Sequence, residues 1–211
     1  MNISYWVGAT LFKCLGKAFF NWRVTGREKL LDEKGVLMCS NHESMLDPPL
    51  CGVVHDFQIA YLARKTLFTG LGKWIYNSWD AIPIDQEKHD MSSLKKIIKR
   101  LKAKDNVLMF PEGERTTTGE ILPGLPGVGL IVAKSGCKVQ PMRIFGAREA
   151  LPRGSFQVKR NQIDIVIGDP LVFSKEEIKE RGKGAYQWIS EQIMEAIANI
   201  EPPAGAKTSF E

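Results

Sequence analysis

The sequence predicts an α/β fold: a single domain with a central mixed, mostly parallel sheet flanked by helices, plus an N-terminal amphipathic helix. Two observations support this prediction. Short apolar runs bounded by turn residues alternate along the chain with segments of helical periodicity, which is typical of βαβ units. The 211 residues, of which 44% are apolar and 25% charged, show no internal repeat and no second apolar core, so one domain suffices.

An aromatic-rich amphipathic segment begins the chain, and residues 1–24 are assigned to it. At about 3.6 residues per turn its apolar residues form one stripe, and Lys13 and Lys17 fall opposite. These lysines interrupt the apolar run, and the segment lacks the pattern of a signal peptide, so we expect neither a spanning helix nor a cleaved leader. It either packs on its own domain or lies in a membrane interface. The second interpretation assigns membrane contact to Trp6, Leu11, Phe12, Lys13, Lys17, Phe19, Phe20 and Trp22.

Six apolar runs are typical of strands, and helical segments separate most of them. The strands are predicted over residues 35–42, 57–63, 79–85, 106–110, 138–146 and 162–171. A short helix is predicted within residues 47–55, and longer helices over residues 91–101, 128–136 and about 175–200. Gly136 ends the helix before it, and Pro202 and Pro203 close the last one. The main domain therefore covers residues 25–203, and residues 204–211 form a frayed tail.

Charge and cysteine content limit the function classes. Lys and Arg number 29 and Asp and Glu 24, so the net charge of +5 suits an anionic partner such as a phosphorylated metabolite or an anionic lipid. No nucleic-acid partner is predicted, because the basic stretch at residues 95–100 is the solvated face of a helix. The four cysteines, Cys14, Cys39, Cys51 and Cys137, lack metal-ligand spacing. We therefore expect a reducing compartment and no zinc site.

Polar turns follow two of the predicted strands, at the edge where open α/β sheets usually bind ligands. The first turn holds His42 and Asp47, which would be rotated by about 140° on a continuous helix, so the backbone must bend for them to meet. Pro48 disfavours the α conformation at Asp47 and suits a helix start there, so the turn can bring His42 to the carboxylate. An imidazole held by a carboxylate is a general base, whereas the alternative is an Asp helix cap beside a surface histidine. His55 and His89 have no carboxylate at this spacing.

The second turn spans residues 110–116, directly after the fourth predicted strand. Gly113 permits a tight turn whose backbone N–H groups can point at an anion, and the planar guanidinium of Arg115 suits a phosphate. The alternative is an ordinary polar loop with a Glu–Arg surface pair.

Both turns together resemble the glycerolipid acyltransferase family, typified by 1-acyl-sn-glycerol-3-phosphate acyltransferases. The first turn provides NHESMLDP at residues 41–48, and the second provides FPEGER about seventy residues later, at residues 110–115. Three further segments resemble the family: WDAIPID (79–85), LPGVGLIVAKSGCKVQPMRI (125–144) and IDIVIGDPL (163–171). The resemblance covers nearly the whole chain after residue 24.

The resemblance implies a catalytic role for the first turn. His42 would take the proton of a substrate hydroxyl, and Asp47 would hold the imidazole ring and stabilise its protonated form. Asn41 and Ser44 lie in the same turn and would support its conformation as part of the substrate-binding site. The freed oxygen would attack the thioester of acyl-CoA or acyl carrier protein directly, with no covalent enzyme intermediate, metal or redox cofactor.

The same resemblance implies an acceptor site in the second turn. Glu112, Gly113 and Arg115 would bind a lysophospholipid, with Arg115 on its phosphate. Arg64 and Lys65 match a basic position after the family's second strand and would add to the phosphate site. The expected acceptor is lysophosphatidate, which would give phosphatidate.

A lipid acceptor also implies a location. The protein is expected to be peripheral, or monotopic, on the cytoplasmic face of a membrane, with anionic phospholipid as a partner. Two alternatives stay open: an acyltransferase for another lysolipid, and a non-catalytic lipid-binding protein, although the latter would predict loss of His42 or Asp47. A phosphate-dependent hydrolase would use a Gly-rich loop or a metal cluster, and neither is visible in the sequence.

Two positions depart from the family pattern. Gln86 follows the third predicted strand where the family usually has arginine, so Arg64, Lys65 or Arg143 would have to replace that cation. Glu114 stands where a small polar residue is common and brings a negative charge beside the expected anion site. Both departures disfavour a doubly charged phosphate monoester as the acceptor.

Overall fold

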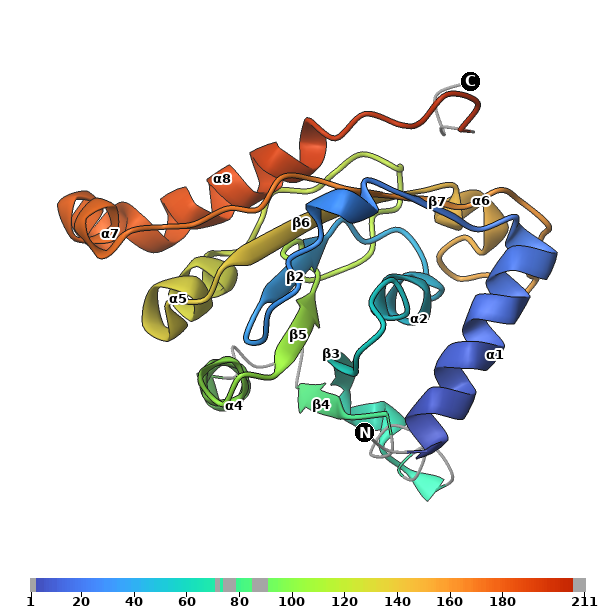
Figure 1. The fold of residues 1–211 in the computed structure, drawn as a ribbon, viewed down its shortest axis with the longest axis horizontal. Helices are drawn as coiled ribbons and strands as arrows, with labels where there is room; N and C mark the ends of the chain where they lie inside the picture. Colours follow the sequence, from blue (N-terminus) through green and yellow to red (C-terminus); the bar gives the residue numbers. More distant parts are fainter. Residues whose placement is uncertain (1–2, 71–72, 74–78, 85–90, 207–211) are drawn as a thin grey trace.

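A seven-stranded sheet forms the centre of the protein in the computed structural model, which describes residues 3–70, 73, 79–84 and 91–206 (Figure 1). Its strands are β1 (Arg23–Thr25), β2 (Leu37–Ser40), β3 (Ile59–Arg64), β4 (Ala81–Ile84), β5 (Asn106–Met109), β6 (Val139–Phe145) and β7 (Asp164–Ile167). They lie in the order β1-β7-β6-β2-β5-β3-β4. The strands from β6 to β4 in this order are mutually parallel, whereas β7 is antiparallel to β6 and β1 is parallel to β7. The prediction of a mixed, mostly parallel sheet is confirmed.

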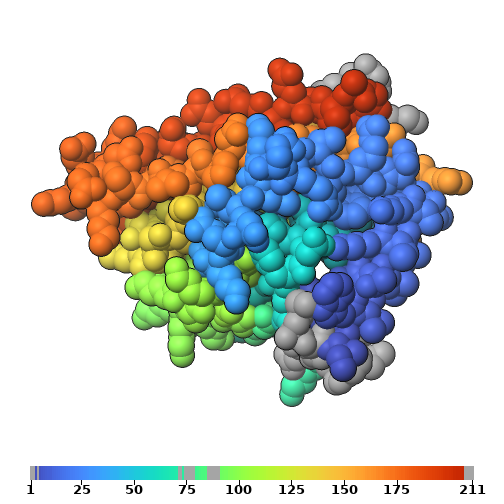
Figure 2. All heavy atoms as spheres, in the orientation of Figure 1, coloured from blue at the N-terminus to red at the C-terminus, as the bar shows by residue number. Residues whose placement is uncertain are grey.

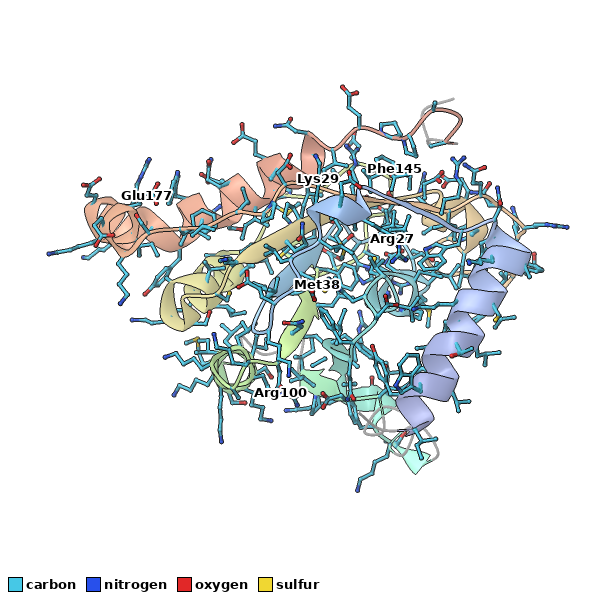
Figure 3. The ribbon with its side chains drawn as sticks, in the orientation of Figure 1. Arg27, Lys29, Met38, Arg100, Phe145 and Glu177 are labelled. Atoms are coloured by element: carbon cyan, nitrogen blue, oxygen red, sulfur yellow. The ribbon has the colours of Figure 1, made fainter. Side chains whose placement is uncertain are left out.

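Helices cover both faces of this sheet (Figure 1). They are α1 (Ile3–Phe20), α2 (Asp47–Gly52), α4 (Met91–Lys102), α5 (Pro126–Ser135), α6 (Ala147–Ala150), α7 (Lys175–Arg181) and α8 (Ala185–Ala198), with 3-10 turns η1 (Arg27–Lys29), η2 (Lys65–Leu67) and η3 (Gly182–Gly184). Helices α4, α5 and α8 pack on the face that carries Leu37 and Cys39 of β2, and α1 and α2 pack on the face that carries Met38. Successive strand residues point to opposite faces, so β2 separates two apolar cores and is buried along its length. Met38, labelled in Figure 3, lies near the centre of the molecule.

The structure differs from the sequence prediction at α6, which the sequence does not predict, at the last predicted helix and at β1. The helix predicted over about residues 175–200 is two helices, α7 and α8, because Gly182 has a φ of 56° that a continuous right-handed helix excludes. The sequence does not predict β1, since three residues are too few to show periodicity, yet β1 pairs with β7 and extends the sheet. The chain therefore joins the sheet at Arg23, within the segment assigned to the N-terminal helix.

Small residues pack α1 onto the domain. A Cβ atom at Gly8 would lie 2.9 Å from the ring of Trp79, and one at Gly16 would lie 3.3 Å from the Cβ atom of Trp22. Both glycines are buried, so the helix backbone approaches the domain closely along this side.

The apolar stripe of α1 faces outward. It consists of side chains that are 42% to 81% exposed: Ile3, Trp6, Val7, Leu11, Leu15 and Phe19, called the α1 stripe below. Lys13 pairs with Asp56 of the domain at 3.0 Å, and Lys17 is exposed. The helix thus both packs on its own domain and presents an apolar surface. Within the described residues, no helix is long and apolar enough to cross a membrane.

The prediction of membrane contact is wrong for Phe20 and Trp22. Their side chains are only 7% and 6% exposed, because they fill the core between α1, α2 and the sheet. Phe12 is half-buried and packs edge-on against Trp79, with ring centroids 5.5 Å apart. These residues lie on the domain side of α1 because the glycines there determine which face packs inward.

Candidate active site

Two polar turns meet at the carboxyl edge of the sheet. Strands β2 and β5 are parallel neighbours, so the turns that follow them lie at the same edge. The backbone N–H of Thr116, in the second turn, donates to the carbonyl oxygen of His42, in the first turn, at 2.9 Å. The structure therefore brings together the two turns that the sequence singles out.

His42 and Asp47 are in contact. His42 Nδ1 lies 2.8 Å from Asp47 Oδ2, and the Asp47 side chain is buried while that of His42 is 18% exposed. The same Asp47 oxygen accepts the backbone N–H groups of Glu43 and Ser44, each at 2.7 Å. Asp47 is the first residue of α2, and Leu46 is the N-cap, so the expectation that Asp47 is the N-cap is wrong. Its carboxylate holds the preceding turn instead of capping the helix that follows.

These contacts orient the His42 imidazole. Asp47 Oδ2 already accepts two backbone hydrogen bonds, so it acts as the acceptor toward Nδ1–H, which leaves Nε2 with the free electron pair. Phe110 stacks on the ring with centroids 4.1 Å apart and planes 17° apart. No sequence pattern predicts this stacking, although Phe110 begins the FPEGER segment.

Glu112 clamps the two turns together. Its Oε1 atom accepts the backbone N–H of His42 at 2.7 Å, and its Oε2 atom accepts the backbone N–H of Leu122 at 2.8 Å. The residue is 4% exposed, and burial raises the pKa of its carboxyl, although these hydrogen bonds oppose the shift. Both of its oxygens hold main chain, and its expected contact with the acceptor stays a prediction.

Asn41 and Ser44 support the first turn from within the core. The Asn41 amide donates to the carbonyl oxygen of Ile144 at 3.0 Å and accepts the backbone N–H of the same residue at 2.8 Å. The Ser44 hydroxyl donates to the carbonyl oxygen of Leu151 at 2.9 Å. Both side chains are almost completely buried, so they position the turn and do not touch a substrate.

Gly113 adopts a backbone conformation that favours glycine. Its φ is 77°, and a Cβ atom there would lie 2.6 Å from Leu125 Cδ1. Glycine therefore lets the second turn close against residues 122–125. Gly113 is also exposed, which is compatible with the expected close approach of its backbone to a ligand.

Three arginines gather beside the histidine pair. Arg115 is half-buried, and its pKa is lowered by burial and by the positive charges of Arg153 and Arg64, while Asp47 opposes the shift. Arg64 ends β3 and Lys65 follows it in η2, and both are exposed. The structure thus places Arg64 and Arg115 in the neighbourhood that the sequence predicts, and adds Arg153.

Arg153 also pairs with the carboxylate of Glu114. Its guanidinium donates to Glu114 Oε2 at 3.1 Å and to the carbonyl oxygen of Arg115 at 2.7 Å. The extra carboxylate therefore carries its own cation and does not cancel Arg115. No spacing in the sequence indicates Arg153, because it lies 38 residues beyond Arg115 in a different loop.

Arg143 cannot replace the arginine that the family usually has at the position of Gln86. Its Nη1 atom donates to the carbonyl oxygens of Ala198 and Ile200 at the end of α8, at 2.7 Å and 2.9 Å. Its guanidinium also lies over the ring of Phe145, 4.8 Å from the centroid. Gln86 and His89 fall outside the described residues.

A buried carboxyl group adjoins the pair. Glu43 is 7% exposed and accepts hydrogen bonds from the Asn41 amide, at 3.0 Å, and from the backbone N–H of Arg148. Burial, followed by the charges of Asp47 and Glu149, raises its pKa from 4.5 to about 8. Glu43 is therefore mostly protonated at neutral pH, which spares Asp47 a second negative charge nearby. In the part of the chain that the structure describes, no three His, Cys, Asp or Glu side chains could hold a metal ion.

The fold and this site define a class: α/β proteins with a histidine–carboxylate pair and an arginine cluster at the carboxyl edge of the sheet. The chain matches the family model described as Acyltransferase over residues 21–145. It is 31% identical over 153 residues to a 1-acyl-sn-glycerol-3-phosphate acyltransferase of Bacillus subtilis (strain 168). The aligned region covers 71% of this chain and 73% of that protein. It is 32% identical over 138 residues to a protein of the same name from Helicobacter pylori (strain J99 / ATCC 700824), with coverages of 61% and 57%.

A solved structure has the same fold. The crystal structure of the 1-acyl-sn-glycerophosphate (LPA) acyltransferase PlsC from Thermotoga maritima matches with a TM-score of 0.71 and 22% identity, over 95% of this chain and 80% of that one. The chain belongs to the acyltransferase family, and it is an O-acyltransferase.

Proposed function

We propose that this enzyme transfers an acyl chain from an acyl thioester to the free hydroxyl of 1-acyl-sn-glycerol 3-phosphate, which gives phosphatidate. The observation that carries the proposal is the His42–Asp47 contact of 2.8 Å beside the arginine cluster. Two relatives with more than 30% identity bear the name of this activity.

The pair supplies general-base catalysis. Asp47 holds Nδ1–H, so Nε2 accepts the proton of the acceptor hydroxyl while the hydroxyl oxygen attacks the thioester carbonyl carbon. The carbon–sulfur bond then breaks, and the imidazolium returns its proton to the leaving thiolate. The buried Asp47 carboxylate stabilises the imidazolium between these two steps. Coenzyme A and acyl carrier protein both provide such a thioester.

The arginines favour a phosphate on the acceptor. Arg115 and Arg64 repel one another, and a phosphate dianion between them would relieve that repulsion. Because Arg153 neutralises Glu114, the net charge of this rim stays positive despite the departure from the family pattern.

One experiment separates the parts of this proposal. Purified protein is assayed with acyl-CoA and with acyl carrier protein as donors, against lysophosphatidate, lysophosphatidylcholine and monoacylglycerol. His42→Ala should lower the rate about a thousandfold, whereas His55→Gln, a control substitution at the buried histidine beside Phe57, should retain the rate. Equal activity of wild type and His42→Ala would refute the catalytic role. Transfer to phosphate-free acceptors alone would refute the lysophosphatidate assignment.

We also propose that the α1 stripe lies in a membrane surface on the cytoplasmic face. The stripe is apolar and aromatic, and the same helix carries the exposed Lys17, which suits an anionic interface. The four cysteines are all free, which agrees with a reducing compartment. An acceptor dissolved in lipid makes attachment useful, since the enzyme then meets its substrate at the surface.

A further inference from the structure

The loop between α6 and β7 exposes apolar side chains at its tip. Phe156 is 92% exposed and Val158 is 45% exposed. The loop is nevertheless ordered by its own hydrogen bonds, because Ser155 N–H donates to the carbonyl oxygen of Pro152 and Lys159 N–H donates to that of Ala150. The loop thus presents an apolar tip, formed by Phe156 and Val158, to the solvent. Residues 152–161 are called the insertion loop below.

Cations flank the apolar tip in the sequence. Arg153 precedes it, and Lys159 and Arg160 follow it directly in the sequence. Behind the tip is a groove of about 410 Å³ lined by Arg148, Glu149, Pro152, Lys159, Arg160 and Asn161. Three cations and a single carboxylate line this groove, so its charge complements an anion.

The insertion loop adjoins the C-terminal end of α1. Ile163 N–H, just beyond the loop, donates to the carbonyl oxygen of Phe20 at 3.0 Å, and the Asn21 amide donates to the Gln162 side chain at 3.3 Å. Figure 1 shows α6 and the segment after it beside this end of α1. In Figure 2 the orange atoms of this segment project at the same edge of the molecule as the blue atoms of α1.

The loop also adjoins the candidate active site. Arg153 donates to the carbonyl oxygen of Arg115, and Leu151 accepts the hydroxyl of Ser44. The insertion loop therefore lies between the C-terminal end of α1 and the arginine cluster.

We propose that the insertion loop is a second membrane contact, distinct from α1, which inserts Phe156 into an anionic bilayer. Lys159, Arg160 and Arg148 bind lipid phosphates around the inserted ring. The inference rests on the proposed function, since it supplies the enzyme with an acceptor drawn from the same bilayer. With α1 and the loop both in contact, the bilayer surface meets the rim formed by Arg153 and Arg115.

A bilayer fits this surface better than an acidic carrier protein does. An aromatic side chain standing clear of the domain and flanked by cations matches the depth profile of a membrane interface, with the ring below the phosphates. The apolar α1 stripe adds a second exposed apolar surface, along an 18-residue helix.

Vesicle partitioning tests the proposal on the full chain. Wild type, Phe156→Ser and the double variant Lys159→Glu/Arg160→Glu are sedimented with phosphatidylcholine vesicles that contain or lack phosphatidylglycerol. We expect Phe156→Ser to lower partitioning about tenfold and the charge reversal to lower it about tenfold or more, only when anionic lipid is present.

Matched controls lie at the opposite edge of the sheet. Val172 is 67% exposed and follows Leu171, which pairs with Val139 at the start of β6. Lys102 and Lys104 are exposed at the end of α4. Val172→Ser and Lys102→Glu/Lys104→Glu should partition as wild type does. Equal partitioning of Phe156→Ser and Val172→Ser would overturn the proposal.

Activity in detergent separates this inference from the proposed function. With lysophosphatidate in micelles and acyl-CoA as donor, the loop variants should keep the wild-type rate, because no bilayer has to be contacted. If wild type transfers no acyl chain but still binds vesicles through Phe156, the proposed function fails and the membrane contact stands. If the charge reversal slows transfer only from acyl carrier protein and leaves vesicle binding unchanged, the loop is a carrier-protein site and the membrane contact is wrong.

Discussion

The Glu112 carboxylate accepts the backbone N–H of His42 at 2.7 Å, 70 residues away along the chain. This bond, with that to Leu122, fixes the position of the histidine relative to the second turn. Glu112→Gln places an amide NH₂ against one of these N–H donors, so we expect kcat to fall about tenfold to a hundredfold with KM nearly unchanged. Steady-state kinetics on lysophosphatidate check this. A large rise in KM with normal kcat would instead show that Glu112 binds the acceptor.

Asp47→Asn should preserve the turn and remove its charge. The Asn oxygen can still accept the backbone N–H groups of Glu43 and Ser44, so circular dichroism and thermal stability should change little. The imidazolium loses its stabilising carboxylate, and kcat should fall by about a hundredfold to ten-thousandfold. Activity within threefold of wild type would contradict the assigned role of Asp47.

Substitutions of Arg115 and Arg143 should have different effects on KM and on stability. Arg115→Lys removes the planar fork that suits phosphate, so the KM for lysophosphatidate should rise about tenfold. Arg143→Lys should leave KM unchanged and lower the free energy of unfolding by about 1 kcal/mol, because Arg143 holds two carbonyl oxygens at the end of α8. Measuring both KM and the denaturation midpoint distinguishes them. A reversed pattern would place the phosphate site at Arg143.

Glu43 should make stability depend on pH. Its pKa is about 8 in the folded protein and near 4.5 when unfolded, so the folded state binds the extra proton between these values. The contribution of Glu43 to the free energy of unfolding is present in full below pH 4.5. It is lost as the pH rises to about 8, and the loss amounts to a few kcal/mol. Asp47 and Glu149 oppose ionisation of Glu43, and Arg143 favours it.

Glu43→Gln isolates this effect. The glutamine can keep the bonds from the Asn41 amide and the Arg148 backbone without titrating. Its melting temperature should fall less than that of wild type between pH 5 and pH 8, a window taken from the pKa of about 8. Parallel pH profiles of the two proteins would show that Glu43 does not titrate in this range.

The α1 stripe is better tested by substitution than by truncation. Deleting residues 1–22 would remove Phe20 and Trp22 from the core and expose Leu50, so loss of binding could reflect unfolding. Leu11→Gln and Leu15→Gln keep a helix former and should lower vesicle partitioning about tenfold together with the melting temperature unchanged. Phe20→Ser should lower the melting temperature instead. Vesicle binding unaffected by both outer substitutions would exclude the stripe as an attachment surface.

Most of the order of strands and helices can be predicted from the sequence because periodicity and turn residues are local signals, but β1 and α6 are too short to show periodicity. The pair His42 and Asp47 can be predicted from the sequence because the two residues lie five positions apart in one turn. Glu112 shows the limit of prediction from the sequence. Its residue type suggests a ligand contact, but its hydrogen bonds depend on the parallel pairing of β2 and β5. Arg153 had no signal at all, because its partners belong to a different loop.

The sequence by itself determined the α/β alternation, the family and the residues of the first turn, since these follow from patterns read along the chain. Only the tertiary structure decided which side of α1 packs inward. An apolar stripe can face a core or a membrane, and the choice depends on how closely another surface can approach. Gly8 and Gly16 lack the Cβ atoms that would hold Trp79 and Trp22 away, so the domain packs on the glycine side and the larger apolar side chains remain exposed.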